Sequence, residues 1–333
     1  MRAYIIRRLL LIIPTLFILT ILVFLAVRFI PGDIIDVMVG QMEHYYGEVD
    51  REAFERMLGL DVPVYVQYGR WIGALPTPDP ITKESHLNGI LQGTLGESLW
   101  GSPLPIEEEI LGRLPVTIGL GLLSIVIGLA IALPVGIYSA IRQDTVADYA
   151  GRTAAIIGLA TPNFWLALMV MIFPAIWWGW APPTTWVPFT EDPLGNLAVL
   201  IIPSLILGTA GAASTMRMTR TMMLEVLRQD YIRTAWAKGL NEGVVVVRHA
   251  IKNALIPVVS LIGLQLPILV GGSVIIENIF NLPGLGRLFL DALDRRDYLV
   301  VSGVNLFFAT VVMLSILLTD LIYPYLDPRV RYR

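Results

Sequence analysis

Long uncharged apolar runs dominate this chain. Six such runs follow one another, and they begin near residues 9, 114, 153, 194, 253 and 298. A helix needs about 20 apolar residues to cross the hydrocarbon core of a bilayer, so each run is long enough to span it. Only 15% of the 333 residues are charged, against roughly a quarter in a soluble domain. The sequence therefore predicts an all-α membrane protein with six transmembrane helices.

The first run predicts a span that is not removed by processing. Arg2, Arg7 and Arg8 precede it, as basic residues precede a signal peptide. The run is long for a signal peptide, however, and residues 28–33 offer no small-x-small cleavage site. We therefore expect an uncleaved first span whose N-terminus lies in the cytoplasm.

The runs divide the chain into five parts. These are a cytoplasmic N-terminus (1–8), a first span (9–30), an extracytoplasmic loop region (31–113), a five-helix core (114–326) and a cytoplasmic tail (327–333). Within the loop region, residues 50–58 predict a short helix with Asp50 as its N-cap. The prolines of residues 76–80 argue against regular structure there.

The third run, residues 153–180, contains two prolines in its interior. Pro162 and Pro174 predict kinks, because proline removes a helical hydrogen bond. Four tryptophans cluster at its far end: Trp177, Trp178, Trp180 and Trp186. An interfacial aromatic belt would explain this cluster. Packing in a protein interior is the alternative interpretation.

Residues 217–252, between the fourth and fifth runs, are strongly basic. They carry Arg217, Arg220, Arg228, Arg233, Lys238, Arg248 and Lys252. At roughly 2.5–3.5 kcal/mol for each charge at the bilayer centre, burial of all seven in lipid would cost about 20 kcal/mol. The stretch is therefore expected to be a water-facing loop.

This basic loop also carries helix start and stop signals. Asp230 is a good N-cap, residues 231–238 fit a short helix, and Lys238 suits the negative C-terminal end. Gly239 suits the left-handed position after a helix, and Asn241 can cap a second helix that leads into the fifth span. A docking element and an ordinary cytoplasmic loop both fit these signals.

The distribution of basic residues predicts the orientation in the membrane. With the N-terminus inside, the inner loops and tails hold fifteen lysines and arginines, whereas the short outer loops hold three. The three outer cations are Arg287, Arg295 and Arg296, and aspartates accompany them. Both termini are therefore expected on the cytoplasmic side of the membrane.

A short amphipathic helix is predicted outside the membrane at residues 283–293. Its apolar face consists of Leu285, Leu288, Phe289, Ala292 and Leu293. The charges on the other face are mixed, which does not suit a helix lying on anionic lipid. We expect the apolar face to pack against protein, so that the helix caps the external mouth of a pathway between the spans, near Glu277. Glu277 itself either orients the outer loop or contacts substrate.

Composition and motif content exclude several functions. The net charge of −3 gives no case for nucleic acid, cysteine is absent, and the three histidines have no metal-ligand spacing. No Gly-Lys pair exists, so a Walker A phosphate loop is excluded and no catalytic residue is assigned. A secondary transporter needs ionisable groups within its spans, and these are nearly absent. If this chain moves a substrate across the membrane, the energy for that step is therefore expected to come from another chain.

The basic loop resembles the cytoplasmic coupling loop of binding-protein-dependent ABC importer permeases. The matching residues are Asp230-Tyr-Ile-Arg-Thr-Ala-x-Ala-Lys-Gly-Leu240, then Arg248-His249 and Asn253-x-x-x-Pro257. Arg233-Thr234-Ala235 stands where the wider superfamily has Glu-Ala-Ala, which is similar to the dipeptide, oligopeptide and nickel branch. Further matches include Arg113-Leu-Pro-x-Thr117, Glu277-x-x-Phe280 and Pro283-Gly-Leu-Gly-Arg287. Residues 76–89 look like an insertion relative to this pattern.

The resemblance implies a type I ABC importer permease fold and a set of partners. These are a second homologous permease, two ATPase subunits that bind ATP and Mg²⁺, and an extracytoplasmic substrate-binding protein. It also implies that Asp230, Tyr231, Arg233, Thr234, Ala235, Lys238, Gly239 and Leu240 form the ATPase-coupling element. The outer gate residues would be Glu277, Pro283, Gly284, Gly286, Arg287 and Phe289. The implied cargo is a di- or oligopeptide, with oligosaccharides or nickel chelates as the alternative.

Overall fold

A computed structural model describes residues 2–28, 35, 51–57, 59–78, 85–98 and 104–326. The chain divides into two compact units. Unit 1 comprises Met1–Ile5, Pro115–Arg287 and Val311–Arg333, and unit 2 comprises Ile6–Leu114 and Leu288–Thr310. The predicted tail at 327–333 and the predicted cap Asp50 lie outside the described residues.

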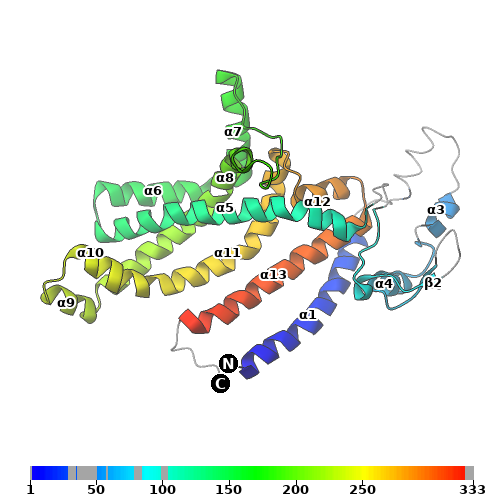
Figure 1. Cartoon of the computed structure of the whole chain (residues 1–333), viewed down its shortest axis with the longest axis horizontal. Helices are drawn as coiled ribbons and strands as arrows, with labels where there is room; N and C mark the ends of the chain where they lie inside the picture. The colour runs from blue at the N-terminus through cyan, green and yellow to red at the C-terminus, as the bar shows by residue number, and fades with distance from the viewer. Residues whose placement is uncertain are drawn as a thin grey trace. The chain divides into compact units, whose positions relative to one another are not determined.

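Helices make up nearly all of the regular structure (Figure 1). The longer ones are α1 (Arg2–Arg28), α5 (Ile106–Ile141), α6 (Val146–Ala160), α7 (Asn163–Trp178), α8 (Pro193–Leu227), α11 (Ile251–Ile279) and α13 (Tyr298–Leu326). The shorter ones are α3 (Arg51–Met57), α4 (Val64–Ile72), η1 (Ile90–Gln92), α9 (Asp230–Ala237), α10 (Glu242–Val244), the π-helix η2 (Val245–Ala250) and α12 (Leu285–Asp294).

The membrane character of these helices agrees with the sequence. Among the described residues, five helices are long and apolar enough to cross a membrane. The pair α6 and α7 provides a sixth candidate if it is counted as one span. The all-α membrane architecture is therefore confirmed, with five or six candidate spans, and the sixth candidate is a bent pair of helices.

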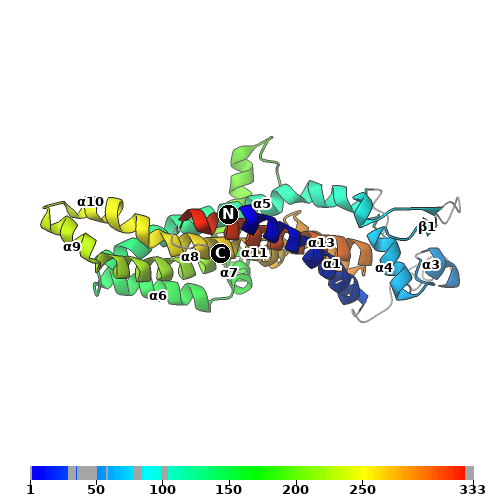
Figure 2. The same ribbon diagram turned by 90° about the horizontal axis from the view of Figure 1, so that it is seen from below.

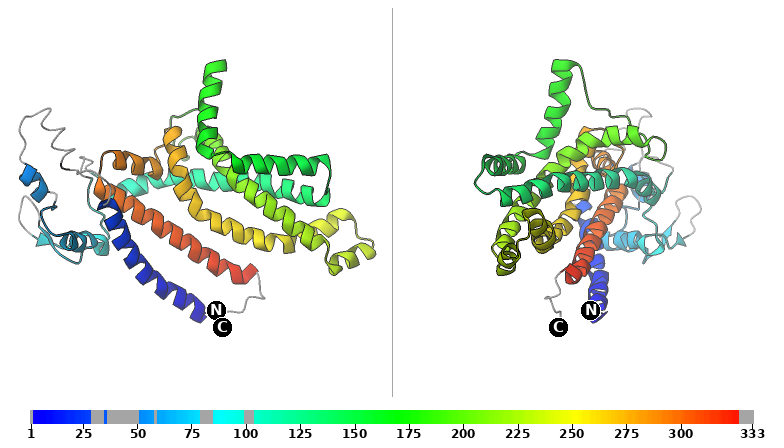
Figure 3. Two further views of the ribbon diagram at one scale, coloured as in Figure 1. Left: turned by 180° about the vertical axis from the view of Figure 1, so that it is seen from behind. Right: turned by 60° about the vertical axis from the view of Figure 1, so that its left-hand side comes forward.

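That bend is much sharper than the predicted kink. The axes of α6 and α7 differ by 94°, and Figure 3 shows α7 standing steeply away from the other helices of unit 1. Thr161 adopts an extended conformation (φ −89°, ψ 118°), as the residue before a proline prefers. Pro162 therefore ends one helix and begins another, whereas Pro174 lies within α7 without breaking it.

The tryptophans at the end of α7 are largely exposed on this chain. Trp177 and Trp178 are 64% and 73% exposed, which disfavours packing in the interior of this chain and suits a membrane-interface belt. Trp186 differs from them, because it packs against a buried cluster that includes Leu120, Leu200 and Phe280.

Two helices are longer than their apolar runs. Helix α5 begins at Ile106, so the end of the predicted loop region (31–113) is helical. Its first turn carries Glu107, Glu108 and Glu109, which suit the positive end of a helix. Helix α8 continues to Leu227, so Arg217 and Arg220 lie in a helix and not in the predicted loop 217–252.

Small residues bring α5 and α8 together inside unit 1. A Cβ atom on Gly208 would lie 2.6 Å from the carbonyl oxygen of Ser124, so only glycine fits there. Ser204 Oγ donates to the carbonyl of Leu120 at 3.3 Å. Such close backbone approach is how helices associate in membranes. Helix α8 also packs against α6, α7 and α11, and its contact with α6 is visible in Figure 2.

Unit 2 contains the described part of the predicted loop region. The predicted helix at 50–58 is confirmed as α3, and α4 was not predicted. The ring of Phe24 lies 5.4 Å from Tyr68 and 5.6 Å from Trp71, which ties α1 to α4. The prediction of no regular structure at 76–80 is wrong in part, because β1 (Thr77–Pro78) pairs with β2 (Ser85–His86).

Candidate functional sites

The predicted coupling helix is present as α9, and its C-terminal signals are confirmed. Gly239 has φ +78°, and its N–H donates to Trp236 O at 2.9 Å. The N–H of Leu240 donates to Ala235 O at 3.4 Å. This pair of bonds is a Schellman motif, which ends a helix at a left-handed residue.

The start of α9 differs from the prediction by one residue. Gln229 occupies the N-cap position, and no side chain caps the helix there. Asp230 is the first helical residue, and its carboxylate lies 3.5 Å from the guanidinium of Arg233. The predicted role of Asp230 as N-cap is therefore wrong, although its charge still suits the first turn.

Helix α9 has one buried face and one exposed face. Ile232 and Ala235 are buried, and they pack against a cluster that includes Ala140, Met223 and Val245. The exposed residues of the helix are Asp230, Tyr231, Arg233, Thr234, Trp236 and Ala237, and Lys238 directly after it is also exposed. Among the predicted coupling residues, Ala235 is buried and Leu240 is partly buried against the same cluster. Ile232 was missed, although it lies three residues before Ala235 on the same helical face.

The segment after α9 is also held in place by specific contacts. Asn241 accepts a hydrogen bond from the N–H of Val244 at 2.9 Å, which confirms its predicted role as a cap. Asn253 Nδ2 donates to the hydroxyl of Tyr231 at 2.8 Å. Arg142 and Glu242 form an exposed ion pair at 2.9 Å. These contacts hold the segment that follows α9, and one of them holds Tyr231 on the exposed face of α9.

A buried ion pair lies at the start of α6 and joins Asp148 to Arg220 of α8. Asp148 is 0% exposed, and Arg220 of α8 donates to both of its carboxylate oxygens at 2.8 Å. Ser139 of α5 donates to the same carboxylate, as does the backbone N–H of Asp144. One carboxylate thus connects α5, α6 and α8.

A sequence signal for this site does exist. Thr145 and Asp148 form a Thr-x-x-Asp pattern, and Thr145 Oγ1 accepts a hydrogen bond from the N–H of Asp148 at 3.3 Å. This pattern predicts a helix that begins at Val146, which would place Asp148 in its first turn. The partner Arg220 is 72 residues away and has no comparable local signal.

The second predicted site is organised by Glu277. This residue of α11 is 0% exposed. Its carboxylate accepts hydrogen bonds from Thr117 Oγ1 at 2.8 Å, from the N–H of Gly286 at 2.7 Å and from the N–H of Arg287 at 3.3 Å. The hydroxyl of Thr117 also accepts from the N–H of Leu285 at 2.9 Å. The buried carboxylate therefore holds the first turn of α12, as helix N-termini hold anions.

The two glycines before and within α12 are required by this contact. A Cβ on Gly284 would lie 2.3 Å from Glu277 Oε2, and one on Gly286 would lie 2.4 Å from Val274 Cα. The helix begins at Leu285 and not at 283 as predicted, so Pro283 precedes it. Glu277, Gly284, Gly286 and Arg287 are brought together, whereas the ring of Phe289 lies 6.3 Å from Phe308.

Thr117 is the functional residue that sequence analysis missed at this site. The threonine was noted only as the end of a sequence motif, and it lies 160 residues from Glu277. The apolar face of α12 is confirmed, since Leu285, Leu288 and Ala292 are all buried. No group of three histidine, aspartate or glutamate side chains suited to a metal occurs in the described part of the chain.

Comparison with known proteins agrees with this architecture. Residues 132–332 match the family model described as binding-protein-dependent transport system inner membrane component. Residues 1–121 match the model of the N-terminal region of binding-protein-dependent transport system membrane components. The chain therefore belongs to this family of inner-membrane permeases of ABC importers.

Full-length relatives are similar over the whole chain. The chain is 39% identical to the oligopeptide transport system permease protein AppB of Bacillus subtilis, and the match covers 100% of both chains. It is 37% identical to the dipeptide transport system permease protein DppB of Escherichia coli, again over 100% of both.

A solved structure supports the fold. An amino acid ABC transporter crystallised with histidines matches with a TM-score of 0.52 and 12% identity, and the match covers 66% of this chain and 94% of that chain. At this level of identity the match shows the fold alone, which is that of an all-α type I permease.

Proposed function

We propose that this chain is one permease subunit of an ATP-driven importer, which forms with a second permease a pathway for di- or oligopeptides. The observation that carries the proposal is similarity over the full length to two peptide permeases. Oligosaccharides and nickel chelates are the alternative cargo. The proposed complex also contains two ATPase subunits on the cytoplasmic side and an external binding protein.

We further propose that the importer works by alternating access, in which the pathway opens to one side of the membrane at a time, and two local structures support this mechanism. The exposed face of α9 offers a surface on which an ATPase subunit can dock, and the buried face of this helix packs on α5 and α8. Helix α12, held by Glu277, is proposed to cap the external mouth. The excess of basic residues in the loop after α8 supports a cytoplasmic position for α9.

Transport by the reconstituted complex tests this proposal. The chain would be placed in proteoliposomes with its second permease and ATPases, and the binding protein would be added outside. ATP-dependent uptake of a dipeptide, with no uptake of an oligosaccharide or a nickel chelate, is the expected result. Uptake of either alternative cargo in place of the peptide would refute the peptide assignment.

ATP binding is expected to require the partner subunits. The chain has no Gly-Lys phosphate loop, so the purified subunit should not bind a radiolabelled or fluorescent ATP analogue. Equilibrium dialysis with the subunit alone and with the complete complex provides the comparison. Saturable binding to the subunit alone would contradict the expectation.

Replacement of Gly239 by valine is expected to lower transport several-fold without preventing membrane insertion. No atom lies within 4 Å of a Cβ built on Gly239, so the effect must come from its φ of +78°. A β-branched residue in that conformation costs on the order of 1–3 kcal/mol. The end of α9 should therefore unwind, which weakens coupling to the ATPase.

Uptake and co-purification of the ATPase subunits would be measured together for Gly239→Val. Gly239→Asn is the matched control, because asparagine tolerates the left-handed conformation. Normal uptake by Gly239→Val at normal expression would show that the end of α9 is not needed for coupling.

A further inference from the structure

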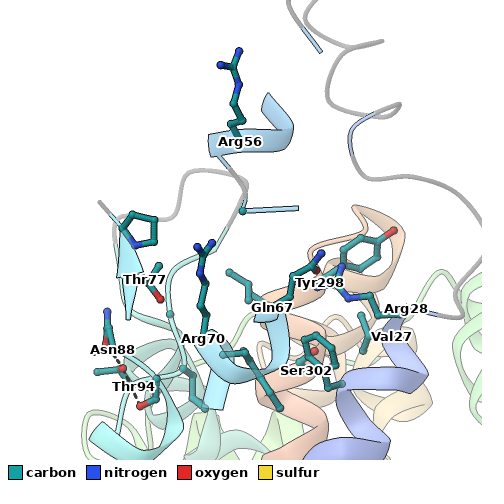
Figure 4. Close-up of a pocket in the computed structure, with 18 residues that line it drawn as sticks. Val27, Arg28, Arg56, Gln67, Arg70, Thr77, Asn88, Thr94, Tyr298 and Ser302 are labelled. Carbon is teal, nitrogen blue, oxygen red and sulfur yellow. Dashed lines mark hydrogen bonds between the residues drawn. The ribbon is translucent and has the colours of Figure 1, made fainter. Parts of the chain in front are cut away.

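A basic cavity lies within unit 2, away from both sites described above. Its volume is about 310 Å³, and it is lined by residues of α1, α4, the segment around η1 and the start of α13 (Figure 4). Phe24, Val27, Leu95 and Leu299 contribute apolar walls. This size lies at the lower end of the range for pockets that bind small molecules.

The charged residues that line the cavity are all cations. Arg28, Arg56 and Arg70 line it, and no aspartate or glutamate does so among the residues that the structure describes. Arg56 donates to the backbone oxygen of Glu52, and in Figure 4 its side chain extends away from the other labelled residues. Arg28 and Arg70 are therefore the two guanidinium groups available to a ligand.

These two arginines lack the partners that such groups normally have. Arg28 rests on the ring of Phe24 at 4.8 Å. Neither Arg28 nor Arg70 forms a hydrogen bond or an ion pair with a described residue. Partly buried guanidinium groups are usually paired with carboxylates or phosphates. Two that stand unpaired around one cavity indicate a site for an anion from outside the chain.

Two buried polar atoms of residues that line the cavity also lack a hydrogen-bond partner among the described residues. Gln67 donates through Nε2 to the carbonyls of Leu60 and Val62, which leaves Oε1 buried without a partner among the described residues. The indole N–H of Trp71 is in the same situation. Buried polar groups without partners are rare in folded proteins, and the described residues alone do not satisfy this lining.

We propose that the cavity binds the C-terminal carboxylate of a short peptide through Arg28 and Arg70, with its last side chain against the apolar walls. The inference rests on the proposed function, since every unmodified peptide cargo ends in a carboxylate. A guanidinium matches a carboxylate in geometry as well as in charge. Among the described residues the lining offers no carboxylate to a peptide amine, so we expect the site to recognise the C-terminal end of the peptide.

The volume limits what enters the cavity. A space of about 310 Å³ holds one or two amino-acid residues and not a long chain. The ends of α1 and α13 form part of the lining, so with the topology proposed above the site lies at the extracytoplasmic ends of these spans. It would hold a peptide outside the membrane before the peptide crosses.

Three dipeptide probes test the proposal on the complete importer without its binding protein. They are alanyl-phenylalanine, its N-acetyl derivative and its C-terminal amide, each radiolabelled and measured by equilibrium dialysis in nanodiscs. The free acid and the N-acetyl peptide should bind alike. The amide should bind about tenfold to hundredfold more weakly, as expected for loss of a charge-assisted bond.

Arginine variants locate the binding to this cavity. Arg28→Gln and Arg70→Gln should each weaken binding of the free acid about tenfold or more and should leave the affinity for the amide unchanged. Arg51→Gln is the matched control, with less than about a twofold change expected, because Arg51 does not line the cavity and pairs with Glu55 at 3.2 Å. Co-purification of the subunits checks that each variant assembles.

The outcomes separate this inference from the proposed function. Equal affinity for acid and amide, or full affinity in both arginine variants, would refute the inference even if the importer transports peptides. If the arginine variants no longer dock the binding protein, and the acid and the amide bind alike, the cavity is a contact surface for that protein. This result would also refute the inference. Acid-specific binding without peptide transport would refute the proposed function alone.

Discussion

Replacement of Asp148 by leucine is expected to destabilise the permease by about 3–5 kcal/mol, because it leaves a partly buried arginine without its counter-charge. Asp148 is 0% exposed and Arg220 is 17% exposed, so neither group can regain full hydration in the folded protein. The change also removes the bonds from Ser139 and Asp144. Helices α5, α6 and α8 would then lose their shared polar contact.

Thermal inactivation of the solubilised complex and the yield of assembled protein would measure this effect. The exposed pair Arg142–Glu242 is a matched control, since its side chains are 50% and 42% exposed. Arg142→Gln should change stability by no more than about 1 kcal/mol. The two variants thus compare a buried and an exposed ion pair on the same side of unit 1.

A double variant tests whether the charge or the bonding geometry is responsible. Asp148→Leu with Arg220→Met removes both charges and replaces them with apolar groups of similar length. Such a replacement is often neutral or even stabilising, so stability should recover by most of the loss. If the double variant is as unstable as Asp148→Leu alone, the uncompensated charge is not the cause of the defect.

The sequence predicted features that depend on neighbouring residues. The apolar runs located the spans, and Gly239 and Asn241 located the end of α9 and the start of the next helix. These signals act over one or two helical turns, so they are readable without knowledge of the tertiary structure. Asp230 was misplaced by one residue because two adjacent polar residues, Gln229 and Asp230, compete for the cap position.

Features that depend on distant residues could not be predicted. The fourth uncharged run ends at Met216, but α8 continues to Leu227, and Arg220 in this extension forms an ion pair with Asp148 of α6. Pro162 predicted a kink between α6 and α7, but the size of that angle, 94°, depends on how each of the two helices packs against α8. Charged residues mark the end of an apolar run, but a helix can continue past them into water, as at the exposed Arg217, or where a counter-charge compensates them, as at Arg220.

The outer site shows the same distinction. The motif Pro283-Gly-Leu-Gly-Arg287 was visible, and its helix was predicted within two residues of its observed start. What the glycines do became clear only from the structure, since Glu277 and Val274 lie where their side chains would be. The hydroxyl of Thr117, which joins Glu277 to α12, comes from a different helix.

Replacement of Gly286 by alanine is expected to destabilise the permease by about 2–5 kcal/mol, the sum of an overpacking cost and a weakened bond to a buried charge. The new Cβ would lie 2.4 Å from Val274 Cα and 2.9 Å from Glu277 Oε2. Val274 contributes backbone there, which cannot rotate away, so α12 must shift. The shift would lengthen the 2.7 Å bond from Gly286 N–H to Glu277.

Gly271→Ala is the matched control for this prediction. Gly271 lies in α11, the helix that carries Glu277, and no atom lies within 4 Å of a Cβ built on it. Alanine should be neutral there or stabilise the helix by up to about 1 kcal/mol. Both variants would be compared by thermal inactivation of the solubilised complex and by peptide uptake. If Gly286→Ala is as stable and as active as Gly271→Ala, then α12 is not held tightly against Glu277, and its proposed role at the external mouth loses its structural basis.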